Sequence, residues 1–143
     1  MIDNHRYLLE KEVLKKENFP ESAYRFVGIG TKEPYVRMAA KTNSGKVYTL
    51  HIELDEFPEF VPEVYVTQML KDKDGNDMDH PSVALHTLRA KNGWTRICHY
   101  GPDAWTPGVS LYRIYIKCRL WLETYEAHLV TGNPLDFYLI HSK

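Results

Sequence analysis

The chain contains, between two predicted strands, the segment Phe57-Pro58-Glu59-Phe60-Val61-Pro62-Glu63-Val64. Proline has no backbone N–H to donate to a sheet, so the two prolines indicate a corner rather than the interior of a strand. Residues 64–67, after the corner, are aromatic or β-branched and predict a short strand. The segment therefore closes one strand and opens the next, and the other elements can be placed on either side of it.

Three strands are expected before this corner. Residues 47–54 alternate apolar and polar side chains, which is typical of a half-buried antiparallel strand. Residues 24–29 and 35–40 predict two further strands, and the turn Asn43-Ser44-Gly45 joins the second to the third. Together with residues 64–67 they predict a four-stranded antiparallel meander.

A helix is expected near each end of the chain. An apolar stripe that includes Leu8, Leu9 and Leu14 predicts a helix over residues 4–17. A longer helix begins after Ser110, a good N-cap, and ends at Gly132. Its predicted apolar face is formed by Leu111, Ile114, Tyr115, Cys118, Trp121, Leu122, Tyr125 and Leu129. The tail, residues 135–140, is apolar enough to pack back on the body, so the fold class is α+β.

The stretch between the meander and the long helix lacks a regular period. Residues 71–77 are polar around an Asp-Gly-Asn centre and predict an exposed hairpin or loop. Residues 80–108 are read as irregular backbone that carries two tryptophans and three histidines. Irregular segments on a rigid scaffold commonly carry the functional site, so the site is expected here.

Composition excludes several classes of protein. A length of 143 residues predicts a single domain over residues 1–143. The 18 basic and 19 acidic residues nearly balance, so neither nucleic acid nor a membrane surface is an expected partner. The charged N-terminus does not predict a signal peptide, and two cysteines are too few for a disulfide framework. A cytoplasmic protein with reduced thiols is expected.

The order of the elements and two short motifs resemble the ubiquitin-conjugating (E2) enzyme family. Residues 57–64 are similar to the E2 segment Tyr-Pro-x-x-Pro-Pro-x-Val, with Val61 in place of one proline. Ile97-Cys98, followed by Trp105-Thr106-Pro107 and a capped helix, is similar to the family's Ile-Cys-Leu…Trp-Ser-Pro. The resemblance covers about residues 4–138. It implies an E2 (UBC-like) fold, with an N-terminal helix, a four-stranded meander, an active-site loop and a long C-terminal helix.

The chain also departs from the family pattern. His80-Pro81-Ser82 stands in place of the family's His-Pro-Asn, whose asparagine helps to hold the oxyanion, and it lies farther from the cysteine. The long helix is longer than the family's, and no room remains for two further C-terminal helices. These features resemble the compact bacterial E2-like proteins of anti-phage operons, which lack that asparagine.

Cys98 is the predicted nucleophile. A thiolate attacks an activated acyl group, and the thioester that results stays reactive toward amines. The alternative, a small buried hydrophobic residue, is the commoner state of an intracellular cysteine. The position of Cys98 between Ile97 and Trp105 favours catalysis, whereas Cys118, on the apolar face of the long helix, is assigned to the core.

The group that assists Cys98 is left open. His86 and His99 are ranked equally as donor or base, ahead of the triplet His80–Ser82. Asp103 is a weaker candidate, since a loop aspartate commonly faces solvent. Asp136, after Asn133-Pro134, is similar to an acidic residue near the E2 site, but the longer helix weakens that match. The histidines and Cys98 offer ligands for zinc, but no ligand spacing supports a site, so neither metal nor cofactor is expected. A Cys/His hydrolase would need a third, orienting group, which the sequence does not identify.

The resemblance implies a transferase that carries a C-terminal glycine on Cys98 and transfers it to a lysine or other amine. The implied partners are a cGAS-like nucleotidyltransferase, as in the CBASS type of anti-phage defence, or a ubiquitin-like modifier, with an E1-like enzyme as a further candidate. The alternative is a non-catalytic binding module of the E2-variant or RWD type, which shares the fold but lacks the cysteine.

Overall fold

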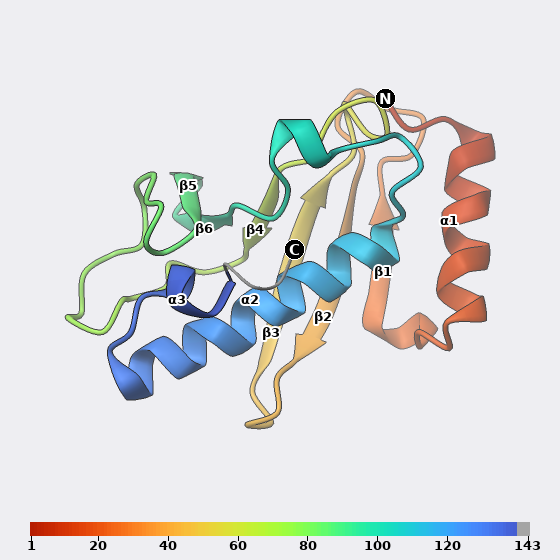
Figure 1. The fold of residues 1–143 in the computed structure, drawn as a ribbon. Helices are drawn as coiled ribbons and strands as arrows, with labels where there is room; N and C mark the ends of the chain where they lie inside the picture. The colour runs from red at the N-terminus through yellow and green to blue at the C-terminus, as the bar shows by residue number, and fades with distance from the viewer. Residues whose placement is uncertain (140–143) are drawn as a thin grey trace.

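A computed structural model describes residues 1–139 and confirms the α+β class (Figure 1). The sheet is antiparallel throughout, with the strand order β1-β2-β3-β4-β6-β5. Ile140, the last residue of the predicted tail, lies outside the described residues. In chain order the elements are α1 (Asn4–Lys16), η1 (Glu21–Ala23), β1 (Tyr24–Val27), β2 (Tyr35–Lys41), β3 (Val47–Glu53), β4 (Val64–Val66), β5 (Thr87–Lys91), β6 (Trp94–Ile97), η2 (Pro102–Ala104), α2 (Leu111–Thr131) and α3 (Leu135–Leu139).

The sheet has six strands rather than the four predicted. The first four form the expected meander, but residues 80–108, read as irregular, contain the hairpin β5–β6, and β6 pairs with β4. The hairpin turn is Asn92-Gly93, and both residues have positive φ, 58° and 74°. Asn-Gly is a strong hairpin signal because both residues tolerate this backbone conformation. The prediction of irregular backbone is therefore wrong for β5 and β6, although Asn92-Gly93 is a sequence signal for the hairpin.

Helix α2 crosses one face of the sheet, and the main hydrophobic core lies between them (Figure 1). As predicted, the helix is capped by Ser110 and ends at Gly132. The Ser110 side chain accepts a hydrogen bond from the Arg113 N–H, and Gly132 has φ 79°. Cys118 and Trp121 of the predicted apolar face are buried against the sheet, whereas Leu129 is exposed. The predicted apolar face is therefore buried over most of the helix, but its last residue, Leu129, is not.

Helix α1 packs less deeply than its apolar stripe predicts. Leu14 is fully buried, but Leu8 and Leu9 are exposed. The buried polar residue of this helix is Glu10, whose carboxylate accepts the Leu111 N–H at 2.7 Å and pairs with Arg6 at 2.8 Å. A carboxylate beside the first N–H groups of a helix is favourable. Helix α1 thus fixes the N-terminal end of α2.

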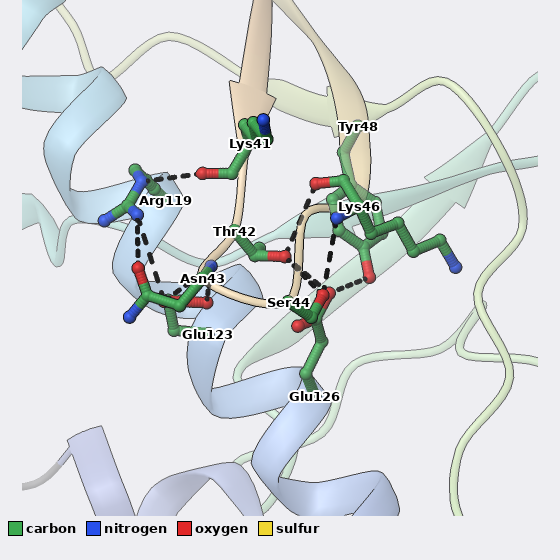
Figure 2. A network of polar contacts seen from close by, with 9 residues as sticks. All are labelled: Lys41, Thr42, Asn43, Ser44, Lys46, Tyr48, Arg119, Glu123 and Glu126. Atoms are coloured by element: carbon green, nitrogen blue, oxygen red, sulfur yellow. Dashed lines mark hydrogen bonds and ion pairs between the residues drawn. The ribbon is translucent and has the colours of Figure 1, made fainter.

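A second contact, shown in Figure 2, fixes α2 farther along its length to the β2–β3 turn. The Glu126 carboxylate accepts hydrogen bonds from the hydroxyls of Thr42 (2.8 Å) and Tyr48 (2.7 Å). Burial would raise the pKa of Glu126, but the hydrogen bonds from Tyr48 and Thr42 outweigh it and hold the pKa below its ordinary value. Two further residues of α2 contact the same turn. Arg119 donates a hydrogen bond to the Lys41 carbonyl, and the Glu123 carboxylate accepts one from the Asn43 N–H. We call the contacts of Glu126 with Thr42 and Tyr48 the turn clasp.

We expect Glu126→Gln to lower the free energy of unfolding by about 1 kcal/mol at pH 7, because an amide accepts weaker hydrogen bonds than a carboxylate. Folding lowers the pKa of Glu126, so this stabilisation is complete above the unfolded-state pKa of about 4.3. It is lost as the pH falls through the still lower folded-state pKa. Urea unfolding at about pH 7 and pH 3 measures the difference, which should shrink at the lower pH. The exposed Glu12→Gln is the matched control, and an equal loss in that variant would contradict the role of the clasp.

Candidate functional site

Cys98 follows directly on the last residue of β6. Ile97 is part of the core and pairs with Thr87 across the hairpin, and the next pair along brings Cys98 opposite His86. The Cys98 N–H donates to the His86 carbonyl at 3.0 Å. The Cys98 side chain is partly exposed, in contrast to Cys118, which has no exposed surface. The structure therefore confirms that Cys118 is a core residue and leaves Cys98 accessible.

The His86 carbonyl accepts a second hydrogen bond, from the indole Nε1–H of Trp121 on α2, at 2.9 Å. One acceptor thus joins the cysteine backbone to the long helix. His86 itself has φ 52°, a left-handed conformation that is uncommon for any residue with a side chain. Such strain persists only where surrounding contacts determine it, and it is frequent at functional sites.

The His86 ring pairs with a carboxylate from the C-terminal end of the chain. Its Nε2 lies 2.7 Å from Oδ1 of Asp136, at the start of α3. Two further contacts hold α3 in place: Leu135 is fully buried, and the Asp136 N–H donates to the Ala84 carbonyl at 2.9 Å. In the neutral tautomer with a hydrogen on Nε2, the ring donates to Asp136 and Nδ1 remains free to accept a proton. This is the orienting group that the sequence did not identify.

Cys98 and His86 line the same cleft, which has a volume of about 430 Å³. The loop 99–104 forms one side of it. The rest of the wall is formed by Lys117, Leu120 and Trp121 of α2 and Leu139 of α3. A cleft of this size, apolar apart from a few polar groups, is typical of a small-molecule or chain-end binding site.

The second predicted histidine, His99, lines the cleft but has a different environment. Its Nε2 lies 2.8 Å from the Pro62 carbonyl, and its Nδ1 is shielded from solvent without a hydrogen-bond partner. Burial lowers the pKa of His99 to about 4, against the opposing effect of the Pro62 hydrogen bond, so the ring is neutral at pH 7. His99 therefore uses its ring N–H to hold the loop, whereas His86 has a carboxylate partner.

The two motifs quoted from the sequence meet in space. The Trp105 Nε1–H donates to the Pro58 carbonyl at 3.0 Å, and the Trp105 ring packs against Phe57 and Tyr100. The loop 99–105 is therefore joined to the proline corner at both ends, by His99 and by Trp105. This arrangement sets the position of the residues immediately after Cys98.

Of the remaining sequence candidates, one lines the cleft and two lie away from it. Asp103 lines the cleft from an exposed position in η2. His80 is exposed beside Asp79, while Ser82 pairs through its backbone with Thr87, and neither lines the cleft. Among residues 1–139, no cluster of three or more His, Cys, Asp or Glu side chains could hold a metal ion.

Sequence reasoning missed Lys117 and gave Asp136 little weight. No local pattern marks Lys117, which is one of several charged residues on a long helix. Asp136 follows Asn133-Pro134, which signals the end of α2 but not the direction in which the chain returns. Both residues reach the site only through tertiary packing.

Comparisons with known proteins identify no relative. No family model matches the chain, and no curated protein or solved structure is significantly similar to it. Of the helices within residues 1–139, none is long and apolar enough to cross a membrane. The function therefore has to be inferred from the geometry of the cleft and from the motifs around it.

We expect iodoacetamide to alkylate Cys98 at least about 100-fold faster than Cys118 in the native protein. Cys118 has no exposed surface, and burial raises the pKa of its thiol. Peptide mass spectrometry over a time course measures both rates, and in concentrated guanidinium the two cysteines should react alike. Equal protection of Cys98 and Cys118 in the native protein would contradict an accessible thiol in the cleft.

Proposed function

We propose that this chain is an E2-like transferase that carries the C-terminal glycine of a protein as a thioester on Cys98 and transfers it to an amine. The observation that supports this most is the position of Cys98. It is a partly exposed thiol at a 430 Å³ cleft, directly after a core strand. The loop that follows it is hydrogen-bonded to the proline corner through Trp105. Both sequence motifs of the E2 resemblance thus meet beside the thiol.

A thiol and a histidine with a carboxylate partner support such a transfer. Loading replaces the leaving group of an activated glycine carboxyl with the Cys98 sulfur. In the second step an amine attacks the thioester carbonyl and must lose a proton. Nδ1 of His86 can take that proton, because its Nε2 is committed to Asp136 at 2.7 Å. Asp136 then stabilises the imidazolium that forms, as the carboxylate does in catalytic triads.

The cargo and setting follow from the resemblance to bacterial E2-like proteins. The cargo is a protein that ends in glycine, either a cGAS-like nucleotidyltransferase or a ubiquitin-like modifier. An E1-like enzyme activates and delivers it, or a nucleotidyltransferase-type partner supplies it directly. The setting is cytoplasmic anti-phage defence. The acceptor is a lysine or another primary amine.

Trapping the adduct tests the carrier function. We expect wild-type protein, co-expressed with a glycine-terminated cargo and its activating enzyme, to form an adduct that thiol reductants cleave. Cys98→Ser should give a more stable ester adduct and Cys98→Ala none. Loss of the adduct in Cys118→Ala but not in Cys98→Ala would overturn the assignment, and a Cys98→Ala variant with full biological activity would favour a non-catalytic binding module.

The His86–Asp136 pair also favours a second candidate, a thiol hydrolase in which water rather than an amine attacks the acyl group. Cys98, His86 and Asp136 supply a nucleophile, a base and an orienting carboxylate, the set of groups that such enzymes use. The acceptor distinguishes the two functions. A carrier releases its acyl group only to an amine, whereas a hydrolase releases the free acid in buffer alone.

We expect His86→Asn and Asp136→Asn to slow discharge of the thioester to a free amine by about 10²-fold and 10-fold, respectively, while loading of Cys98 continues. Asparagine tolerates the left-handed backbone at residue 86, so this substitution removes the base with little effect on the chain. Single-turnover discharge across about pH 6–9 measures both rates, and the exposed His5→Gln serves as the control. Discharge at the wild-type rate in both site variants would contradict a role for this pair.

A further inference from the structure

Lys117 of α2 places a primary amine in the same cleft as Cys98. Its Nζ lies 3.8 Å from the centre of the Tyr100 ring and 3.5 Å from the carbonyl oxygen of His99, the residue directly after Cys98. Lys71 and Lys91 have carboxylate partners, but none of the ion pairs found in residues 1–139 involves Lys117. Within the described part of the chain, the contacts of its charge are the face of an aromatic ring and a carbonyl dipole.

The environment of Lys117 lowers the pKa of its amine. Burial lowers the pKa of Lys117, and the positive charge of Arg113, one helical turn earlier, lowers it further, against a small opposing effect of Cys118. A lysine that is partly desolvated beside another cation is a better nucleophile at neutral pH than a solvated one. The amine therefore lies in the cleft and has a lowered pKa, the two properties that an acyl acceptor needs.

We propose that Lys117 is an internal acceptor for the acyl group carried by Cys98, so that the loaded protein conjugates its cargo to itself when no other amine is supplied. The proposal rests on the proposed thioester on Cys98. It assigns a modification site on α2 and makes the acceptor an amine already present in the cleft.

The transfer is a balanced acyl exchange. The Lys117 amine attacks the thioester carbonyl, a C–N bond forms, and the C–S bond to Cys98 breaks. The amine proton passes to the departing thiolate, through His86 or solvent, so that Cys98 returns to the free thiol. The product is an amide that thiol reductants do not cleave, and no oxidant or further reactant is needed.

The Lys117 side chain lies beside the backbone segment that directly follows Cys98. The amine already touches the residue next to Cys98, and four methylene groups let it rotate away from the Tyr100 ring. Trp121, one turn further along α2, holds the backbone of His86 and hence of Cys98 against the same helix. Thioester and amine therefore lie on two elements that are hydrogen-bonded to each other, which raises the effective concentration of the internal amine.

A purely electrostatic role for Lys117 makes a different prediction. A cation that only stabilises the oxyanion or the cargo is replaced by arginine, which keeps the charge but is a poor acyl acceptor. The Lys117→Arg variant therefore separates nucleophile from charge, and Lys32→Arg, in an exposed loop, is the matched control.

The experiment loads purified full-length protein with an alkyl thioester of a short peptide that ends in glycine, which exchanges directly onto thiols. We expect a reductant-sensitive adduct within minutes and then a reductant-resistant adduct, which tryptic mass spectrometry maps to Lys117. In Lys117→Arg the ratio of resistant to sensitive adduct should fall at least about tenfold, while Lys32→Arg behaves as wild type. Thermal unfolding checks that each variant is folded.

Three results would overturn the inference. The first is a resistant adduct that persists in Lys117→Arg or maps to other lysines. The second is a stable thioester with no resistant product, which leaves the carrier function in place and removes only the internal acceptor. The third is acylation of Lys117 in Cys98→Ala, since the amine would then react without the thioester. A wild-type protein that forms no sensitive adduct would instead remove the carrier function, and the internal acceptor with it.

Discussion

The arrangement of the site depends on a single backbone oxygen, the carbonyl of His86. It accepts the N–H of Cys98 across the β5–β6 hairpin and the indole N–H of Trp121 from α2. A carbonyl that accepts two hydrogen bonds is costly to displace, because each donor would lose its partner. The cysteine, the histidine and the helix are therefore positioned relative to one another by one atom. The left-handed backbone of His86 directs that atom, which restricts this position to the few residue types that tolerate positive φ.

Helix α2 transmits this constraint to the rest of the fold. Glu10 of α1 fixes its first turn, and the turn clasp at Glu126 fixes a point near its C-terminal end. Between these two points the helix buries its apolar face against the sheet and presents Lys117 and Trp121 to the cleft. The site is thus built between two rigid bodies, a sheet edge and a helix, and the short helix α3 adds a carboxylate. Rigid supports of this kind hold reacting groups in position better than loops do.

Features fixed by neighbouring residues were predictable from the sequence. The cap at Ser110, the stop at Gly132 and the burial of Cys118 follow from local chemistry and helical period, and the structure confirms them. The β5–β6 hairpin was missed because residues 87–91 alternate weakly, although Asn92-Gly93 marked the turn. The pairing of His86 with Asp136 joins residues 50 positions apart, and it depends on how α3 returns across α2. No local pattern specifies that return, so the assisting group had to be found in three dimensions.

The proline corner has a consequence for the kinds of side chain that can face it. Pro58 and Pro62 have no N–H, so along this edge the two residues present oxygen atoms and no donors of their own. Whatever is fastened there must bring a polar hydrogen on a side chain, and His99 and Trp105 each bring one on a flat ring nitrogen. Phenylalanine has the right shape at either position but nothing to donate. The proline corner therefore favours side chains that carry an N–H at positions 99 and 105. Residues some forty positions earlier in the chain thus fix the conformation of the loop beside Cys98.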